Sequence, residues 1–267
     1  MIVKAKIKYL VILLALATIM VYLFWGPLFP WSPVKSGYKK INSSKATIYI
    51  RDFSERDSVV YHIDQIIQDE ENFHDLKYVD DFKIVILNKE SNMKRYLPWL
   101  KSSGYSVSLS LANVVYIGPT ARKSQAGIEP YLKHELSHLL IGQNTTFKKT
   151  LKILDQGWFG EGIAEYFSGH SFYSKVEFLQ SWRINNLKLA SLFEKNPHKM
   201  LARELKLRYS YYRFFMEFVI ENFGLKKLQE YLKKYIDNPE DYKKLFVEVY
   251  STDLDEILRK FNSSLNM

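Results

Sequence analysis

The first apolar stretch of the chain is long enough to form one membrane-spanning helix. Three lysines precede a run from Tyr9 to Trp25, in which Thr18 is the only clearly polar residue. At about 1.5 Å of rise per helical residue, this run covers about 25 Å, close to the thickness of the hydrocarbon core of a bilayer. We therefore expect residues 1–31 to form a transmembrane helix with a short apolar extension.

Three interpretations of this helix are open. Ala15-Leu16-Ala17 mimics a signal-peptidase site, but it lies inside the apolar run, which favours an uncleaved signal anchor over a cleaved signal peptide. A buried core helix is the third interpretation, and the basic flank together with Trp25 and Trp31 argues against it. Four lysines between residues 35 and 45 follow the apolar run, so the difference in positive charge between its two ends, which sets the orientation of a helix in the membrane, is small. Because an N-terminal anchor usually exports a long domain behind it, we expect a single-pass protein of the cell membrane with an extracytoplasmic domain.

The remaining pattern predicts a linker and one domain. Residues 32–45 are rich in Ser, Pro, Gly and Lys and are predicted to be the linker. Short extended segments then alternate with helices, and helical spacing dominates from Glu129 onward. The expected strands are 46–51 and 82–87 with further extended segments in 105–117, and the expected helices are 57–71 and 88–100. We predict an α+β domain, residues 46–267, with a small mixed sheet in its N-terminal lobe and a helical C-terminal lobe.

Composition narrows the chemistry that this domain can perform. Hydrophobic residues make up 47% of the 267 positions, which is ample for a packed core. The chain has no cysteine, so thiol nucleophiles and thiolate metal sites are excluded, and a metal would have to be bound by His, Asp or Glu. The net charge of +9 lies on scattered lysines, which is typical of a solvated surface rather than of a specific anionic partner, and no segment resembles a nucleic-acid-binding module.

The candidate chemistry begins in the sequence His134-Glu135-Leu136-Ser137-His138, which is flanked by apolar residues that suit a partly buried helix. Residues four apart on a helix lie one above the other, so both imidazoles can face one metal ion while Glu135 projects beside them. Two surface histidines on an ordinary helix are the alternative. A catalytic zinc site needs three protein ligands and one open position, so a third ligand must come from elsewhere.

A second element offers that ligand. Residues 158–166 read Trp-Phe-Gly-Glu-Gly-Ile-Ala-Glu-Tyr and predict a helix with Glu161 and Glu165 on one face. HELSH followed by WFGEGIAEY resembles the peptidase-MA-like gluzincins, zinc metallopeptidases with the pattern HExxH and then WxxEGxAxY. The resemblance implies a zincin-like metalloprotease fold.

The resemblance also assigns roles at the metal. It implies that His134, His138 and Glu161 bind Zn²⁺, and that Glu135 is the general base for the zinc-bound water. Glu165 is similar to the acidic residue that accepts the free N–H of a ligating His in this family, and a solvated helix carboxylate is its alternative.

A tyrosine is expected to complete the site. Residues 209–212 followed by Phe223-Gly224 resemble the family segment in which a Tyr opens a helix and donates to the oxyanion, which implies Tyr209. A structural role for this tyrosine stays open, and so do Tyr212 and His170 as the donor.

The expected function is peptide-bond hydrolysis by a membrane-anchored zinc metallopeptidase acting on a peptide or protein substrate. The chain departs from the family's aminopeptidases because it has no Gly-x-Met-Glu-Asn segment before the HExxH helix, which favours an endopeptidase. Residues 112–118 resemble the edge strand along which such enzymes lay an extended substrate. Two alternatives are a catalytically inactive zinc-binding surface or interaction protein of the same fold, and a non-enzymatic module in which both motifs are accidental.

Overall fold

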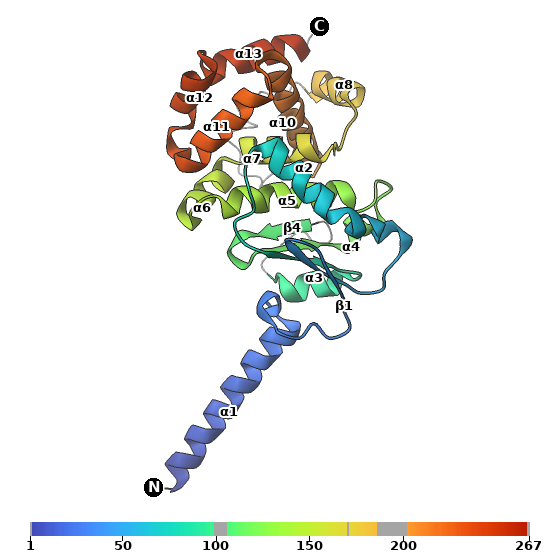
Figure 1. Ribbon diagram of the computed structural model, residues 1–267, viewed down its shortest axis with the longest axis vertical. Helices are drawn as coiled ribbons and strands as arrows, with labels where there is room; N and C mark the ends of the chain where they lie inside the picture. The colour runs from blue at the N-terminus through green and yellow to red at the C-terminus, as the bar shows by residue number, and fades with distance from the viewer. Residues whose placement is uncertain (1, 99–105, 170, 186–201, 266–267) are drawn as a thin grey trace. The chain divides into compact units, whose positions relative to one another are not determined.

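The computed structural model describes residues 2–98, 106–169, 171–185 and 202–265, and Figure 1 labels their helices and strands. The chain is mixed α+β, mostly helical with one five-stranded sheet. It divides into two compact units. Unit 1 comprises residues 1–63 and 81–128, and unit 2 comprises residues 64–80 and 129–267.

Unit 1 holds the sheet and the N-terminal helix. Its helical elements are α1 (Ile2–Trp25), η1 (Phe29–Trp31), η2 (Glu55–His62), α3 (Glu90–Tyr96), η3 (Ser110–Ala112) and α4 (Pro119–Lys123). Its strands are β1 (Lys39–Asn42), β2 (Ala46–Ile50), β3 (Phe82–Ile86), β4 (Ser106–Leu109) and β5 (Val114–Ile117). Within α1, the segment Ile7–Phe24 is long and apolar enough to cross a membrane, with a mean hydropathy of 2.3 and none of its residues buried.

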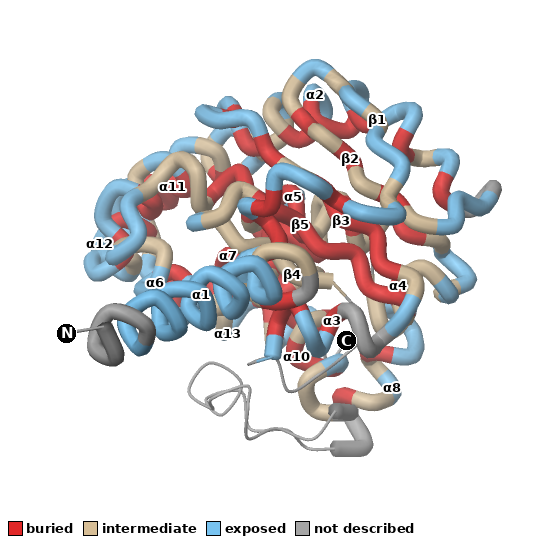
Figure 2. Tube along the Cα trace, turned by 90° about the horizontal axis from the view of Figure 1, so that it is seen from below, coloured by how far each residue is buried: buried red, intermediate tan, exposed pale blue. Residues whose placement is uncertain are grey.

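The sheet order is β1-β2-β3-β5-β4. β2, β3 and β5 run parallel to one another, and β1 and β4 are antiparallel to their neighbours. β3 and β5 are internal and form much of the buried core in Figure 2. The predicted edge strand is therefore wrong: residues 114–117 pair with a strand on both sides, and among the described strands the free edges belong to β1 and β4.

The segment predicted to be a linker differs from the expectation in part. It contains β1, and its side chains at Ser32 and Lys35 are buried. The predicted helix 57–71 is also divided, because η2 precedes α2 (Ile63–His74). The strands expected at 46–51 and 82–87 are present as β2 and β3.

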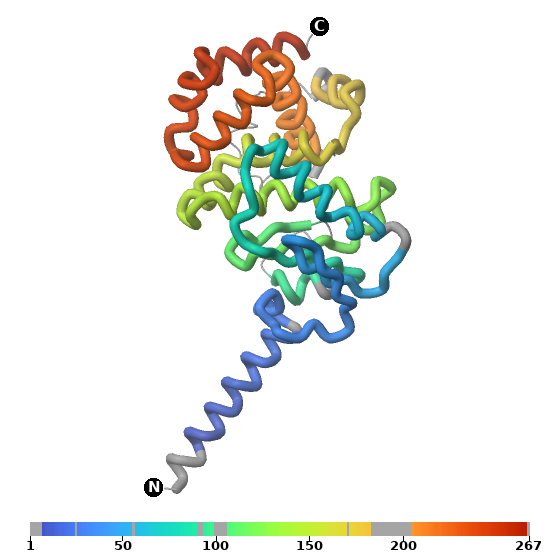
Figure 3. The backbone as a smooth tube through the Cα atoms, viewed as in Figure 1, coloured from blue at the N-terminus to red at the C-terminus, as the bar shows by residue number. Residues whose placement is uncertain are grey.

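Unit 2 is helical. It contains most of α2 together with α5 (Glu129–Gln143), α6 (Phe147–Gln156), α7 (Trp158–Ser168), α8 (Lys175–Asn185), α10 (Ala202–Phe223), α11 (Leu225–Asp237), η5 (Pro239–Asp241), α12 (Tyr242–Tyr250) and α13 (Leu254–Leu265). α2 lies beside helices that follow it by many residues, as the colours in Figure 3 show. For example, the Gln229 side-chain amide in α11 donates to the carbonyl oxygens of Asn72 (3.0 Å) and Phe73 (2.9 Å).

α7 is the central helix of unit 2, with α5 and α10 packed against it. Gly162 makes the crossing with α10 possible. A Cβ atom at this position would lie 3.0 Å from Met216 Cγ and 3.2 Å from the carbonyl oxygen of Tyr212. A larger residue would therefore push α7 away from α10. The close crossing thus helps to set the position of α7, and with it the positions of the α7 side chains that reach α5.

Candidate metal centre

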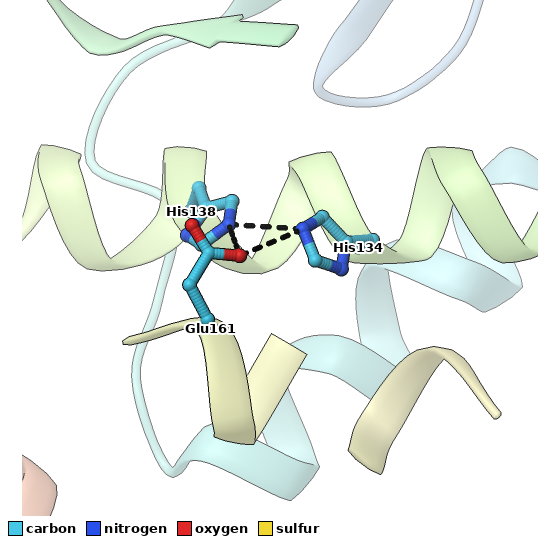
Figure 4. A group of neighbouring side chains, drawn as sticks. All are labelled: His134, His138 and Glu161. Atoms are coloured by element: carbon cyan, nitrogen blue, oxygen red, sulfur yellow. Dashed lines mark hydrogen bonds and ion pairs between the residues drawn. The ribbon is translucent and has the colours of Figure 1, made fainter. Parts of the chain in front are cut away.

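Two helices bring three potential ligands to one point. His134 and His138 lie one turn apart on α5, and their Nε2 atoms are 3.1 Å from each other. Glu161, in the first turn of α7, places its Oε2 atom 3.3 Å from each of these nitrogens. Figure 4 shows the three side chains pointing toward one another. Among the described residues, these three form a group that can hold a metal ion.

The separations suit a tetrahedral zinc ion. Zn–N and Zn–O bonds of about 2.0–2.2 Å at tetrahedral angles place neighbouring ligand atoms about 3.3–3.5 Å apart. The three observed separations, 3.1, 3.3 and 3.3 Å, form a nearly equilateral triangle of that size. The three side chains are 15–23% exposed, so the group lies near the surface. A tetrahedral ion held by these three atoms would have its fourth coordination position left for water or substrate.

A buried carboxylate oxygen in this group supports a bound cation. Glu161 Oε2 is buried and has no hydrogen-bond donor in good geometry, although both imidazoles lie close to it. Burial of Glu161 opposes its ionisation, yet the neighbouring His138 and His134 hold its pKa well below the usual range. An ionised carboxylate whose buried oxygen has no well-placed hydrogen-bond donor needs another positive partner. A metal ion bound to that oxygen would supply it.

The surroundings of His134 also favour positive charge. Burial opposes protonation of His134, but Glu161, Glu165 and Glu135 together raise its pKa to about 10. Three carboxylates therefore surround a position where a cation is stabilised, and a divalent metal bound by neutral imidazoles would take the place of that proton.

The other predicted carboxylates lie close to the ligands. Glu165, one turn after Glu161 on α7, is 3% exposed and places Oε1 3.4 Å from His134 Nδ1. A carboxylate at this position could accept the N–H of Nδ1, which would leave the lone pair of Nε2 for a bound metal. Glu135 is 7% exposed and acts electrostatically on both His134 and Tyr209.

Two of the three candidate oxyanion donors lie in the part of the chain that the structure describes. The Tyr209 ring meets His134 edge-on with 6.5 Å between ring centroids. The carboxylate of Glu161, followed by burial, raises the Tyr209 pKa well above its usual value, so its hydroxyl keeps the proton that it would donate. Tyr212 is fully buried and its hydroxyl contacts Arg208 Nε. His170 lies outside the described residues. Tyr209 lies inside α10, which begins at Ala202, rather than opening the helix.

A buried cluster formed by side chains of α5 and α2 was not predicted from the sequence. Ser137 Oγ lies 2.6 Å from His74 Nε2, and His74 Nδ1 lies 2.9 Å from the carbonyl oxygen of Glu70. Ser, His and Glu are the residue types of a hydrolase triad, but all three are 0% exposed, so no substrate reaches the hydroxyl. The Tyr78 hydroxyl also donates to the Leu136 carbonyl oxygen (3.1 Å). These contacts help to hold α5 in place.

The cluster predicts two opposite pH trends in stability. Burial, with help from His138, lowers the pKa of His74 to about 4, against the hydrogen bond to Glu70. The contribution of neutral His74 to the free energy of unfolding is therefore complete above about pH 6.5, and it is lost as the pH falls toward 4. Burial raises the pKa of Glu70 well above 4.5, against Ser137, His134 and Lys133. Stability from Glu70 is full below pH 4.5 and is lost as the pH rises.

We expect Glu70→Gln to separate these trends. Gln is neutral at every pH, so the free energy of unfolding of this variant, relative to wild type, should rise by up to about 1.4 kcal/mol per pH unit above pH 4.5. Thermal melts in a pH series would measure the difference. Glu230→Gln, at a carboxylate that is 53% exposed, is the control and should show no such slope. A constant difference between Glu70→Gln and wild type from pH 4.5 to 8 would mean that Glu70 is ionised in the folded chain.

The chain has a distant structural likeness to a known protein. No family model and no curated protein sequence matches the chain. Among solved structures, the chain is similar to the crystal structure of an M1 zinc metallopeptidase E323A mutant from Deinococcus radiodurans, bound to a Tyr-Ser-Ala substrate. The match covers 84% of this chain and 50% of the other, with 12% identity and a TM-score of 0.46. The chain thus spans about half the length of that protein, and a likeness at this level carries no functional argument.

The fold and the candidate site together describe an α+β protein with a potential metal centre. The chain is an α+β protein with two imidazoles and one carboxylate converging on a potential metal position.

Proposed function

We propose that this chain is a membrane-anchored zinc metallopeptidase with a zincin-like fold. The observation that carries the proposal is the near-equilateral triangle of His134 Nε2, His138 Nε2 and Glu161 Oε2. Its dimensions suit zinc, and its three ligands leave a fourth position open, as in catalytic rather than structural zinc sites. Glu135, Glu165 and Tyr209 lie around the same position and support a hydrolytic role.

The proposed chemistry divides among these residues. Zn²⁺ at such a site supplies Lewis acidity and lowers the pKa of water from about 15.7 toward 7. Glu135 takes the proton from the attacking water and later delivers it to the leaving amine. Tyr209, which keeps its proton because carboxylates surround it, donates to the oxygen on which negative charge develops. Glu165 keeps the His134 ring in the productive orientation.

Peptide bonds are the proposed substrate, with internal bonds favoured because the chain has no Gly-x-Met-Glu-Asn segment. The test is incubation of the full chain with a mixed peptide library, followed by mass spectrometry of the products. We expect internal cleavage that stops on chelation and returns with added Zn²⁺. Zinc binding without cleavage would support the inactive metal-binding alternative, and no zinc binding would overturn the proposal.

Tyr209→Phe should lower kcat by about tenfold to a thousandfold, with little change in KM or zinc content. The reason is that a donor to the oxyanion acts mainly in the transition state. Steady-state kinetics on a cleaved peptide, combined with metal analysis, would check this.

Tyr212→Phe is the matched control for Tyr209→Phe. Its hydroxyl is buried and contacts Arg208 Nε, so its loss should leave kcat near wild type and reduce the unfolding free energy by about 1–3 kcal/mol. If Tyr212→Phe alone abolishes turnover, Tyr209 is not the donor.

Membrane attachment through α1 is the second part of the proposal. The apolar segment Ile7–Phe24 has no buried residue, so nothing in the described chain covers it. We expect the full-length protein to stay with membranes through washes in high salt and to leave only with detergent, because the attachment is hydrophobic. Cell fractionation with immunoblotting would measure this. Release by salt, or a mature N-terminus beyond Ala17, would contradict it.

A further inference from the structure

The segment that follows α1 is built into the core of unit 1. Phe29 is 2% exposed and stacks on Tyr96, with ring centroids 4.2 Å apart. It belongs to a buried cluster of α3 and the strands that also contains Val85, Leu87, Met93, Leu97, Val114 and Tyr116. An aromatic side chain in such a cluster is a strong attachment, because its burial removes a large apolar area from water. The chain is therefore fixed to the sheet unit four residues after the anchor helix ends.

Two lysines hold the backbone of the same segment. Lys35 is 7% exposed, and its Nζ atom donates to the carbonyl oxygens of Phe29 and Ser32. Lys83, from β3, donates to the carbonyl oxygen of Pro30 at 2.7 Å. Burial, with Lys83 nearby, lowers the pKa of Lys35 to about 8. Two ammonium groups therefore satisfy the carbonyl groups of η1 and join it to the sheet.

The segment is equally continuous with α1. The backbone N–H groups of Gly26 and Leu28 both donate to the carbonyl oxygen of Tyr22, at 3.1 and 3.2 Å. Figure 1 shows η1 following directly on the end of α1. The turn that leaves the helix and the residues buried in unit 1 are thus the same few residues, with no free tether between them.

The side chains that alternate with the buried ones are apolar and exposed. Leu28 is 37% exposed, Trp31 54% and Val34 54%. If Ile7–Phe24 spans the hydrocarbon core, about 27 Å at 1.5 Å per residue, these three follow it at the depth of the lipid headgroups. Tryptophan is enriched at this depth because its ring is apolar and its N–H needs a polar partner.

We propose that residues 26–35 clamp unit 1 onto the end of the anchor helix, so that unit 1 lies on the bilayer surface with Leu28, Trp31 and Val34 in the headgroup layer. This inference rests on the proposed membrane anchoring. The attachment of unit 1 to the anchor helix is rigid rather than a flexible tether. The partner of the three exposed side chains is a lipid surface.

The absence of cysteine from the chain makes a direct test available, because any introduced cysteine is the sole labelling site. Three single-cysteine variants of the full chain, Leu14→Cys, Trp31→Cys and Leu111→Cys, would each carry a nitroxide in phosphatidylcholine vesicles. Power saturation with oxygen and with a water-soluble nickel chelate then reports depth. Leu111, which is 71% exposed in η3, is the aqueous reference.

We expect the Leu14 label at hydrocarbon depth and the Trp31 label at the interface, with collisions with nickel chelate several-fold fewer than at Leu111. A Trp31 label as accessible to nickel as the Leu111 label, with Leu14 still deep, would overturn the clamp and leave the anchor standing. A Leu14 label in water would overturn the anchoring itself.

The rigidity of the clamp has its own readout. A nitroxide at Val34→Cys should give a broad, immobilised spectrum that sharpens in Phe29→Ala and in Lys35→Met. Phe53→Ala, the same change at a phenylalanine that is 39% exposed in unit 1, should leave the spectrum unchanged. A mobile Val34 label in the wild-type background would contradict rigid attachment whatever the two variants do, including failure to fold.

Discussion

Glu135→Gln should lower kcat for peptide cleavage by about a hundredfold to ten-thousandfold while the chain keeps its zinc. Gln has nearly the shape of Glu but cannot take the proton from the attacking water. Since Glu135 is not one of the three converging ligands, metal binding should persist. Peptide cleavage followed by mass spectrometry, beside elemental analysis of the same preparation, would measure both quantities.

Glu129→Gln is the matched control on the same helix. Its carboxylate is 49% exposed and pairs with Lys133 at 2.6 Å, away from the ligands, so turnover and zinc content should stay near wild type. Unchanged turnover in Glu135→Gln would remove Glu135 from the mechanism. Loss of zinc in Glu135→Gln would mean that Glu135 helps to hold the metal, and the assignment of Glu161 would then need revision.

Glu161→Ala should reduce bound zinc from about one ion per chain to near zero after dialysis, because two imidazoles alone make an incomplete site. The loss of turnover should follow the loss of metal. Zinc titration of the metal-free chain, followed by competition with a chelator of known affinity, would give the change in dissociation constant.

Glu165→Gln tests the neighbouring carboxylate in the same titration. Its effect should be smaller, about tenfold to a hundredfold in metal affinity, since it orients His134 rather than binding the ion. Glu221→Ala, at an exposed position on α10, is the control. Equal zinc affinity in Glu161→Ala and in the control would show that the metal, if bound, lies elsewhere.

Sequence spacing predicted the part of the candidate site that lies within one helix. The spacing of four positions from His134 to His138 places both rings on one face of α5 without information about the rest of the chain. The position of Glu161 depends on how α7 packs on α5, which the local pattern does not contain. It was available only through the resemblance to a two-part motif.

The Ser137 and His74 contact shows the limit of such reasoning. These two residues are 63 positions apart, and neither has a distinctive neighbourhood in the sequence. The order of the strands was missed for a related reason, because pairing across a sheet is not a local property. One signal was present, since Val-Val-Tyr-Ile at 114–117 is a continuous apolar run, and such runs are typical of strands buried on both faces.

The segment 32–45 was predicted to be a linker from its composition, and it contains a strand and two buried side chains. Proline, serine and lysine are common in linkers, and a lysine whose ammonium group binds backbone carbonyl groups cannot be distinguished by composition from one in water. Phe29 was assigned to the apolar extension of the anchor, although it is a core residue of the sheet unit.

α7 carries the proposed metal ligand Glu161 and the proposed orienting residue Glu165 one turn apart, and both side chains reach His134 on α5. A tilt or rotation of α7 would therefore move the Glu161 oxygen away from the imidazoles and the Glu165 oxygen away from His134 Nδ1 in the same motion. A substitution that moves α7 would thus change the position of the Glu161 oxygen and the orientation of the His134 ring together. A change at the Gly162 crossing with α10, on a helix face that touches no metal ligand, would alter both together.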